Sequence, residues 1–149
     1  MTTYEIHRKQ WVPQPLEKVF EFFAKAENLE ELTPPFLHFQ ITLAPPRMEA
    51  GARIEYKLRV HGLPIHWGTI IEEWNPPKQF VDNQAKGPYE LWHHTHRFSA
   101  ENGGTWIEDT VRYALPFGPI GRIVNRVMVS RDVNAIFDYR ERRVRELFG

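Results

Sequence analysis

The sequence of 149 residues contains no cysteine. This absence excludes disulfide bonds, thiolate nucleophiles and cysteine-ligated zinc or iron–sulfur centres. Serine occurs only at Ser99 and Ser130, and neither lies in the G-x-S-x-G motif of α/β-hydrolases. Basic and acidic residues balance at 19 each, so no overall charge favours nucleic acid or an anionic membrane. We therefore expect no nucleic-acid partner.

Long hydrophobic segments are also missing. No stretch approaches the roughly 18 apolar residues of a spanning helix, and the first residues contain no apolar signal segment. These two absences predict a cytoplasmic protein without stable membrane insertion. The length and the hydrophobic fraction of 42% fit one domain over residues 1–149 with a substantial core.

Residues 92–113 carry the clearest pattern in the chain. Asn102-Gly103 separates two alternating runs, and Asn-Gly favours a two-residue hairpin turn because both positions need positive φ. This turn places His96 opposite Asp109, with His94 on the same face. The other residues of that face are mainly apolar or aromatic. Two imidazoles and a carboxylate in such a wall are more typical of a pocket lining than of a dry core.

The rest of the chain predicts a mixed α and β order. Alternation and turn residues indicate strands at 4–12, 36–43, 54–60, 65–71 and 79–85, with a Gly62-Leu63 turn inside the second hairpin. Pro15 is suited to open a helix, a second short helix is expected at 28–32, and an apolar periodicity indicates one long helix over 120–147. A curved sheet beneath a long helix would leave a cavity between them.

This order resembles the helix-grip fold of the SRPBCC superfamily, which includes START lipid-transfer domains, birch-pollen-allergen-like proteins, and polyketide cyclases and dehydratases. The similarity is greatest to a bacterial single-domain branch labelled "cyclase/dehydrase" or ligand-binding SRPBCC. The residues that carry it are Leu32-Thr33-Pro34-Pro35-Phe36, Trp74-Asn75-Pro76-Pro77, Phe80-Val81-Asp82-Asn83-Gln84, Gly87-Pro88-Tyr89, Trp92-x-His94-x-His96-x-Phe98, Gly103-Gly104-Thr105, and Asp109 with Tyr113.

The resemblance implies an α+β fold with a curved antiparallel sheet of about seven strands. It also implies two short helices after the first strand and a long C-terminal helix across the concave face. A hydrophobic cavity for a small organic or lipid-like ligand belongs to the same expectation, with no cofactor. The resemblance implies no shared catalytic set, because this fold carries binding proteins and enzymes alike.

His94, His96 and Asp109 are the candidate catalytic residues. A carboxylate beside an imidazole can orient a ligand or assist proton transfer, and it can equally be a buried pair that satisfies itself. His-x-His on a strand also suits some metal sites. We expect no metal here, because Trp92 and Phe98 flank the two histidines and leave little room for a coordination sphere.

The candidate ligand-binding residues are mostly aromatic and are expected on the inner faces of the sheet and of the helix. They are Phe36, Phe39, Tyr56, Trp67, Phe80, Gln84, Trp92, Tyr113, Val124 and Met128. The arginines of the C-terminal helix, Arg140 among them, are interpreted as a solvated face, with an Arg131–Asp132 ion pair near the cavity mouth.

The leading hypothesis is a binding protein for a small hydrophobic or aromatic ligand, polyketide- or lipid-like. A second hypothesis is a cyclase, aromatase or dehydratase that uses His/Asp proton transfer, and a third is a protein-interaction module with a filled cavity. No feature of the sequence specifies an oligomeric state.

Overall fold

Seven antiparallel strands form one sheet in the order β1-β7-β6-β5-β4-β3-β2 in the computed structural model, which describes residues 1–149. The strands are β1 (Tyr4–Val12), β2 (Gln40–Leu43), β3 (Arg53–Val60), β4 (Leu63–Asn75), β5 (Gln79–Lys86), β6 (Leu91–Glu101) and β7 (Gly104–Ala114). The helical segments are α1 (Leu16–Phe23), η1 (Ala26–Leu29), η2 (Pro35–Leu37), α2 (Gly118–Val124), η3 (Asn125–Val129) and α3 (Ser130–Phe148).

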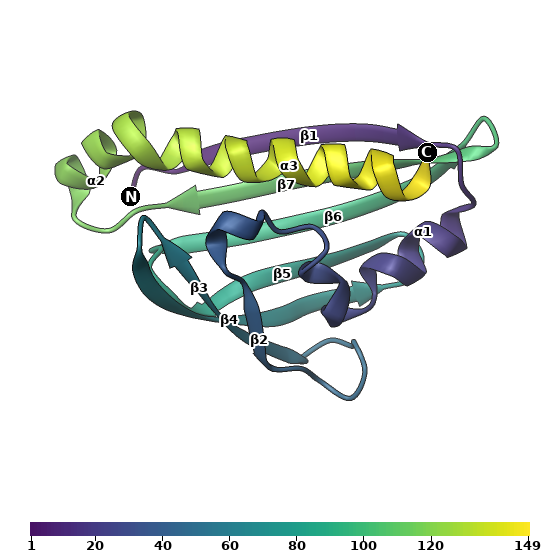
Figure 1. The fold of residues 1–149 in the computed structure, drawn as a ribbon, viewed down its shortest axis with the longest axis horizontal. Helices are drawn as coiled ribbons and strands as arrows, with labels where there is room; N and C mark the ends of the chain where they lie inside the picture. Colours follow the sequence, from purple (N-terminus) through teal and green to yellow (C-terminus); the bar gives the residue numbers. More distant parts are fainter.

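The predicted helix-grip arrangement is confirmed. Figure 1 shows the sheet curling beneath α3, which runs along β1 and β7. The segments α1, η1 and η2 carry the chain from β1 at one edge of the sheet to β2 at the other edge. None of the helices combines the length and the hydropathy that crossing a bilayer requires.

The predicted register of the β6–β7 hairpin is correct. Asn102 and Gly103 both have positive φ, at 54° and 76°. His96 pairs with Asp109, and His94 pairs with Val111. This pairing follows from the turn alone, because the two central residues fix which residues face each other on the two strands.

The predicted register of the β3–β4 hairpin is wrong by two residues. The turn lies at His61-Gly62, with φ values of 50° and 80°, so Val60 pairs with Leu63. Both turn residues adopt positive φ, which is the two-residue turn that suits the twist of a hairpin. A shift of two keeps every side chain on its expected face, because strand side chains alternate with a period of two.

The predicted strand over 36–43 begins later than expected. Pro35 to Leu37 forms a single 3-10 turn, and β2 begins only at Gln40. The turn buries Leu37 and leaves Phe36 63% exposed. The preceding short helix is likewise a 3-10 turn, over Ala26–Leu29.

The C-terminal helix contains a π-helical turn that the periodicity did not predict. Helix α2, the π turn η3 and α3 follow one another without a break. Asn125 in this turn is buried, and its Oδ1 accepts a hydrogen bond of 2.7 Å from the Tyr113 hydroxyl. A π turn changes the phase of a helix. The buried residues of α3 are Val133, Phe137, Val144 and Phe148.

Gly103 provides a test of the hairpin turn. Replacing it by alanine places a Cβ at positive φ, which costs about 1–2 kcal/mol of folding free energy. We expect Gly103→Ala to lower the free energy of unfolding by that amount in urea denaturation. Glu101→Ala, at the exposed residue just before the turn, is the control and should lose much less. Equal losses in the two variants would contradict a strict backbone requirement at Gly103.

Candidate functional site

A cavity of about 330 Å³ lies between the inner face of the sheet, the turns after α1, and α3. Most of the residues that line it are hydrophobic. Helix α3 contributes Val133, Ile136, Phe137 and Arg140 to its wall. The polar groups of the wall include Asp82, His94 and His96 on β5 and β6.

Half of the expected ligand-binding residues line this cavity. They are Phe39, Tyr56, Trp67, Phe80 and Trp92. The Phe39 ring packs on Tyr56 with 4.6 Å between centroids, and Tyr56 stacks on Trp67 at 6.0 Å. Tyr56 and Trp67 face each other across the β3–β4 hairpin, and Phe39 joins them from the segment before β2.

The other five expected residues lie elsewhere. Phe36 is excluded by the 3-10 turn that exposes it. Val124 and Met128 do not line the cavity, and Val124 is 36% exposed. Val129, Val133 and Ile136 line the cavity instead.

Gln84 and Tyr113 have structural roles that place them behind the cavity wall. Gln84 donates through Nε2 to the Tyr89 carbonyl at 2.8 Å and accepts from the Tyr89 backbone N–H at 3.0 Å. This clamp holds Tyr89, which was not among the expected ligand-binding residues, in the wall. The Tyr89 ring packs edge-on against Tyr113 at 5.8 Å.

Two carboxylates hold the two histidines of the cavity wall. His94 Nε2 lies 2.8 Å from Asp109 Oδ1, and His96 Nε2 lies 2.5 Å from Asp82 Oδ2. His96 lies opposite Asp109 as expected, but the hydrogen bond of Asp109 is with His94, and His96 Nδ1 lies 3.5 Å from Asp109 Oδ1. The His96 ring is stacked between His94 at 3.6 Å and Phe80 at 4.0 Å, so its Nε2 edge points toward β5.

Arg140 completes this group of charged side chains, and its interpretation as part of a solvated face is wrong. Its side chain is only 11% exposed, and Nη2 lies 3.3 Å from Asp109 Oδ1 and 3.5 Å from His96 Nδ1. The signal was present in the sequence, because Val133, Phe137, Arg140 and Val144 share one face of a helix. The predicted Arg131–Asp132 pair is absent, and Asp132 instead lies 2.7 Å from His61.

The neighbours of each buried acid decide its charge state. Burial alone would raise the pKa of Asp109, but the charge of Arg140 and the hydrogen bond with His94 outweigh burial and lower it well below its usual range. For Asp82 burial is likewise outweighed, mainly by His96, and the pKa is lowered. Burial and the nearby His94 lower the pKa of His96 to about 4. His96 is therefore a neutral imidazole beside two carboxylates near pH 7.

Among the other polar residues of the wall, Trp67 stands out by its indole N–H. Trp67 is buried, and its Nε1 has no hydrogen-bond partner in the structure. A buried donor without a partner costs free energy, so this N–H would be stabilised by an acceptor that reached it. The cavity wall itself combines apolar side chains with a neutral imidazole and carboxylates.

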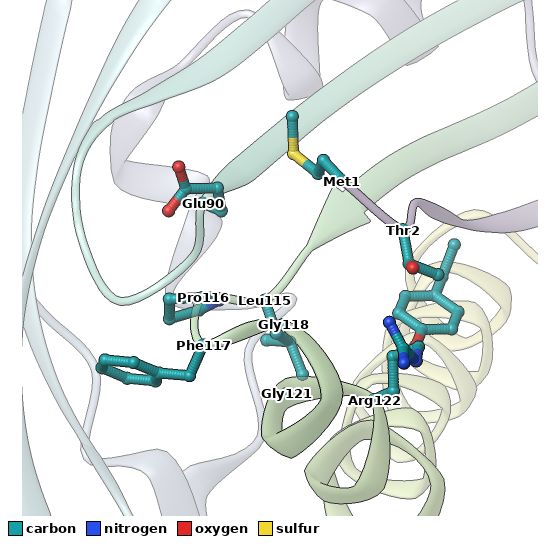
Figure 2. Close-up of a pocket in the computed structure, with 10 residues that line it drawn as sticks. Met1, Thr2, Glu90, Leu115, Pro116, Phe117, Gly118, Gly121 and Arg122 are labelled. Atoms are coloured by element: carbon teal, nitrogen blue, oxygen red, sulfur yellow. The ribbon is translucent and has the colours of Figure 1, made fainter.

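A second hollow of about 320 Å³ lies where the start of the chain meets α2. Figure 2 shows Met1, Thr2, Glu90, Phe117 and Arg122 around it. It holds no cluster of buried titratable groups, and the Phe117 ring beside it is 79% exposed. The cavity beneath α3 is therefore the stronger candidate for a functional site.

Comparisons with known proteins agree with the fold and with the resemblance read from the sequence. A family described as "Polyketide cyclase / dehydrase and lipid transport" matches residues 12–137. No curated protein matches the chain.

Among solved structures, the protein TTHA0849 from Thermus thermophilus is 21% identical with a TM-score of 0.67, covering 95% of this chain and 97% of that one. Ara h 8.0201 is 17% identical with a TM-score of 0.63, covering 94% and 96%. A norcoclaurine synthase mutant from Thalictrum, in complex with a transition-state analogue, is 13% identical with a TM-score of 0.68, covering 99% and 98%. At these identities the likeness shows the fold.

Arg140 gives a test of the buried charges. Arg140→Leu leaves Asp109 without its cationic partner, and breaking a buried pair costs about 3–5 kcal/mol. We expect the free energy of unfolding, measured in urea, to fall by that amount. The matched control is Arg143→Leu on the same helix, whose partners Glu31 and Glu146 are more than half exposed. It should remain close to wild type, and a comparable loss would contradict the special role of Arg140.

The lowered pKa of His96 predicts acid sensitivity. In the unfolded chain this imidazole takes up a proton near pH 6.5, whereas in the folded protein it does so only near pH 4. Between these two pH values the folded state binds fewer protons than the unfolded state. The contribution of neutral His96 to the free energy of unfolding is therefore fully present above this range and is lost as the pH falls through it. The melting temperature should fall between these pH values, and His96→Gln should flatten that fall. His93→Gln, on the outer face of β6, should keep the wild-type slope.

Proposed function

Since the chain belongs to the polyketide cyclase/dehydrase and lipid transport family, we propose that its cavity binds a small hydrophobic or aromatic molecule, polyketide- or lipid-like. The observation that carries the proposal is the cavity of about 330 Å³ beneath α3, lined mainly by apolar side chains with a few convergent polar groups. A concave apolar site with few polar groups is the usual form of a small-molecule site.

The polar groups narrow the chemistry of the ligand. The unpaired Trp67 N–H calls for a hydrogen-bond acceptor such as a carbonyl, hydroxyl or ether oxygen. A neutral His96 beside Asp82 offers a second polar contact in the same wall. A purely aliphatic molecule would satisfy neither group, so the ligand that fits is an oxygen-bearing, largely apolar compound.

A proton-transfer enzyme is the second candidate, and the His96–Asp82 pair favours it. A neutral imidazole can accept a proton, and a carboxylate 2.5 Å away stabilises the imidazolium that forms. In a cyclase or dehydratase, this pair would remove a proton next to a carbonyl group of the bound ligand. His94 and Asp109 would then support His96 by stacking and by charge.

The interaction-module hypothesis has less support, because it expects a cavity filled by side chains. The roles of His94, His96 and Asp109, the absence of a cofactor and the cytoplasmic location stay predictions of the sequence.

Blocking the cavity tests the binding proposal. Ile136 lines the cavity from α3, so Ile136→Trp should fill it and reduce the binding of an apolar fluorescent probe at least about tenfold. Ile123→Trp is the matched control, because Ile123 is 64% exposed on the outer face of the same helical run. Thermal melts establish that both variants fold. Unchanged probe binding by a folded Ile136→Trp variant would refute an internal site.

The two candidates separate once the molecule that co-purifies with the protein is identified by native mass spectrometry. If the protein is an enzyme, it should convert that molecule or its precursor. His96→Gln should then lower turnover about 10²–10⁴-fold while the ligand still binds. If the protein only binds, the molecule returns unchanged from prolonged incubation with the wild type.

A further inference from the structure

Three potential metal ligands meet at the cavity wall. Asp82, His94 and His96 each offer one atom, and these atoms lie within 4.8 Å of one another. The Asp82 Oδ2 atom is 2.5 Å from His96 Nε2 and 4.0 Å from His94 Nδ1. Ligand atoms that share one ion at about 2.0–2.2 Å each lie about 3–3.5 Å apart, so shifts of about 1 Å would complete the geometry.

A second carboxylate faces the opposite edges of both imidazoles. Asp109 Oδ1 lies 2.8 Å from His94 Nε2 and 3.5 Å from His96 Nδ1. A carboxylate that accepts a hydrogen bond from one ring nitrogen of a histidine keeps the proton on that nitrogen. The other ring nitrogen, which would face the metal ion, then keeps a free lone pair. In His94 the hydrogen bond to Asp109 uses Nε2, so a neutral ring presents a bare Nδ1 toward Asp82.

The ring edges that face Asp82 therefore bring hydrogen-bond acceptors together with too few donors between them. The His94 Nδ1 lone pair and the Asp82 carboxylate are both acceptors and face each other. The only proton at this edge is the one shared between His96 and Asp82. When both imidazoles are neutral, the charged groups here are the carboxylates of Asp82 and Asp109 and the guanidinium of Arg140. Their sum is one net negative charge among buried groups. A cation between Asp82 and the two rings would compensate that charge.

The surroundings leave room for a coordination sphere. Trp92 packs against Trp67 and Tyr89, and Phe98 packs against α1, so neither ring crowds the edges that face Asp82. This removes the reason for expecting no metal. Asp82, His94 and His96 all line the cavity, which leaves the remaining coordination positions open to it.

We infer that Asp82, His94 and His96 form a binding site for one divalent first-row transition-metal ion, with Asp109 as the outer carboxylate. Two imidazoles and one carboxylate suit zinc, cobalt, nickel or iron(II) rather than calcium or magnesium, which prefer all-oxygen sites. Three protein ligands with an open position facing a cavity are typical of metal sites that bind or activate a small molecule. The ion would hold an oxygen atom of a cavity ligand.

Titration calorimetry with Zn²⁺ on chelator-treated protein tests the site. We expect one ion per chain in the wild type. Asp109→Asn should weaken binding about 10–100-fold, the usual effect of losing an outer carboxylate. Asp82→Asn and His94→Gln should weaken it further. His93→Gln is the matched control, since His93 is the next residue of β6 and lies 3.3 Å from Glu72 on the other face. It should bind Zn²⁺ like the wild type.

Substitution with Co²⁺ provides a measurement on the wild type itself, in case a ligand variant fails to fold. Bound Co²⁺ should give hyperfine-shifted N–H proton signals from two imidazoles in the NMR spectrum, and His93→Gln should keep both. A wild type that binds Zn²⁺ more weakly than about 1 mM, or a folded His94→Gln variant that binds it equally well, would overturn the site. If the wild type fails to bind Zn²⁺, the Asp82 and His96 pair holds a proton rather than a metal ion.

The outcome is independent of the proposed binding function. The fluorescent probe reports the apolar cavity, whereas calorimetry reports the ion. Loss of Zn²⁺ binding in Asp82→Asn with retained probe binding would be expected if both proposals hold. A wild type that binds the probe without Zn²⁺ would contradict only the metal site, and one that binds Zn²⁺ without the probe would contradict only the binding function.

Discussion

The burial of Asp109 on the inner face of β7 is the constraint on which much of the structure depends. A carboxylate removed from water is very unfavourable unless it is paired and hydrogen-bonded. His94 from the neighbouring strand and Arg140 from α3 supply those partners. Since Arg140 must reach Asp109, the position of α3 along the sheet is fixed by charge as well as by apolar packing.

The same pairing extends across the sheet toward the cavity. The stack of His94, His96 and Phe80 links β6 to β5, where Asp82 meets His96. A continuous group of contacts therefore runs from the helix through three strands, β7, β6 and β5, into the wall of an apolar cavity. In a medium of low dielectric constant such contacts are strong, and each of them orients the next. The cavity thereby acquires a rigid polar patch in an otherwise apolar wall.

The aromatic residues give the rest of the wall its shape. Trp67 packs against the rings of Tyr56, Tyr89 and Trp92. Tyr89 is held there by the paired hydrogen bonds from Gln84. The cavity therefore has two kinds of surface, an aromatic group and a group of imidazoles and carboxylates. A molecule bound between them would have its orientation fixed by its polar atoms.

Predictions from the sequence succeeded where the physical cause is local. The Asn102-Gly103 turn specifies its own backbone conformation, so the pairing of His96 with Asp109 was correct. The β3–β4 turn was misplaced because a turn containing glycine fits two registers, and the choice of His61-Gly62 depends on the twist of the strands. The inner faces were still assigned correctly, since a shift of two residues preserves alternation.

The sequence by itself determined most strand positions, the β6–β7 register and the presence of two histidines and an acid on an aromatic face, because alternation and turn conformation act between near neighbours. Only the tertiary structure decided that Arg140 is buried, that His96 turns to Asp82, and that Val124 and Met128 lie outside the cavity. The reason is that partners for buried charges and polar groups come from elements distant in the chain. Which partner each buried charged or polar group pairs with is determined only when the helix packs on the sheet.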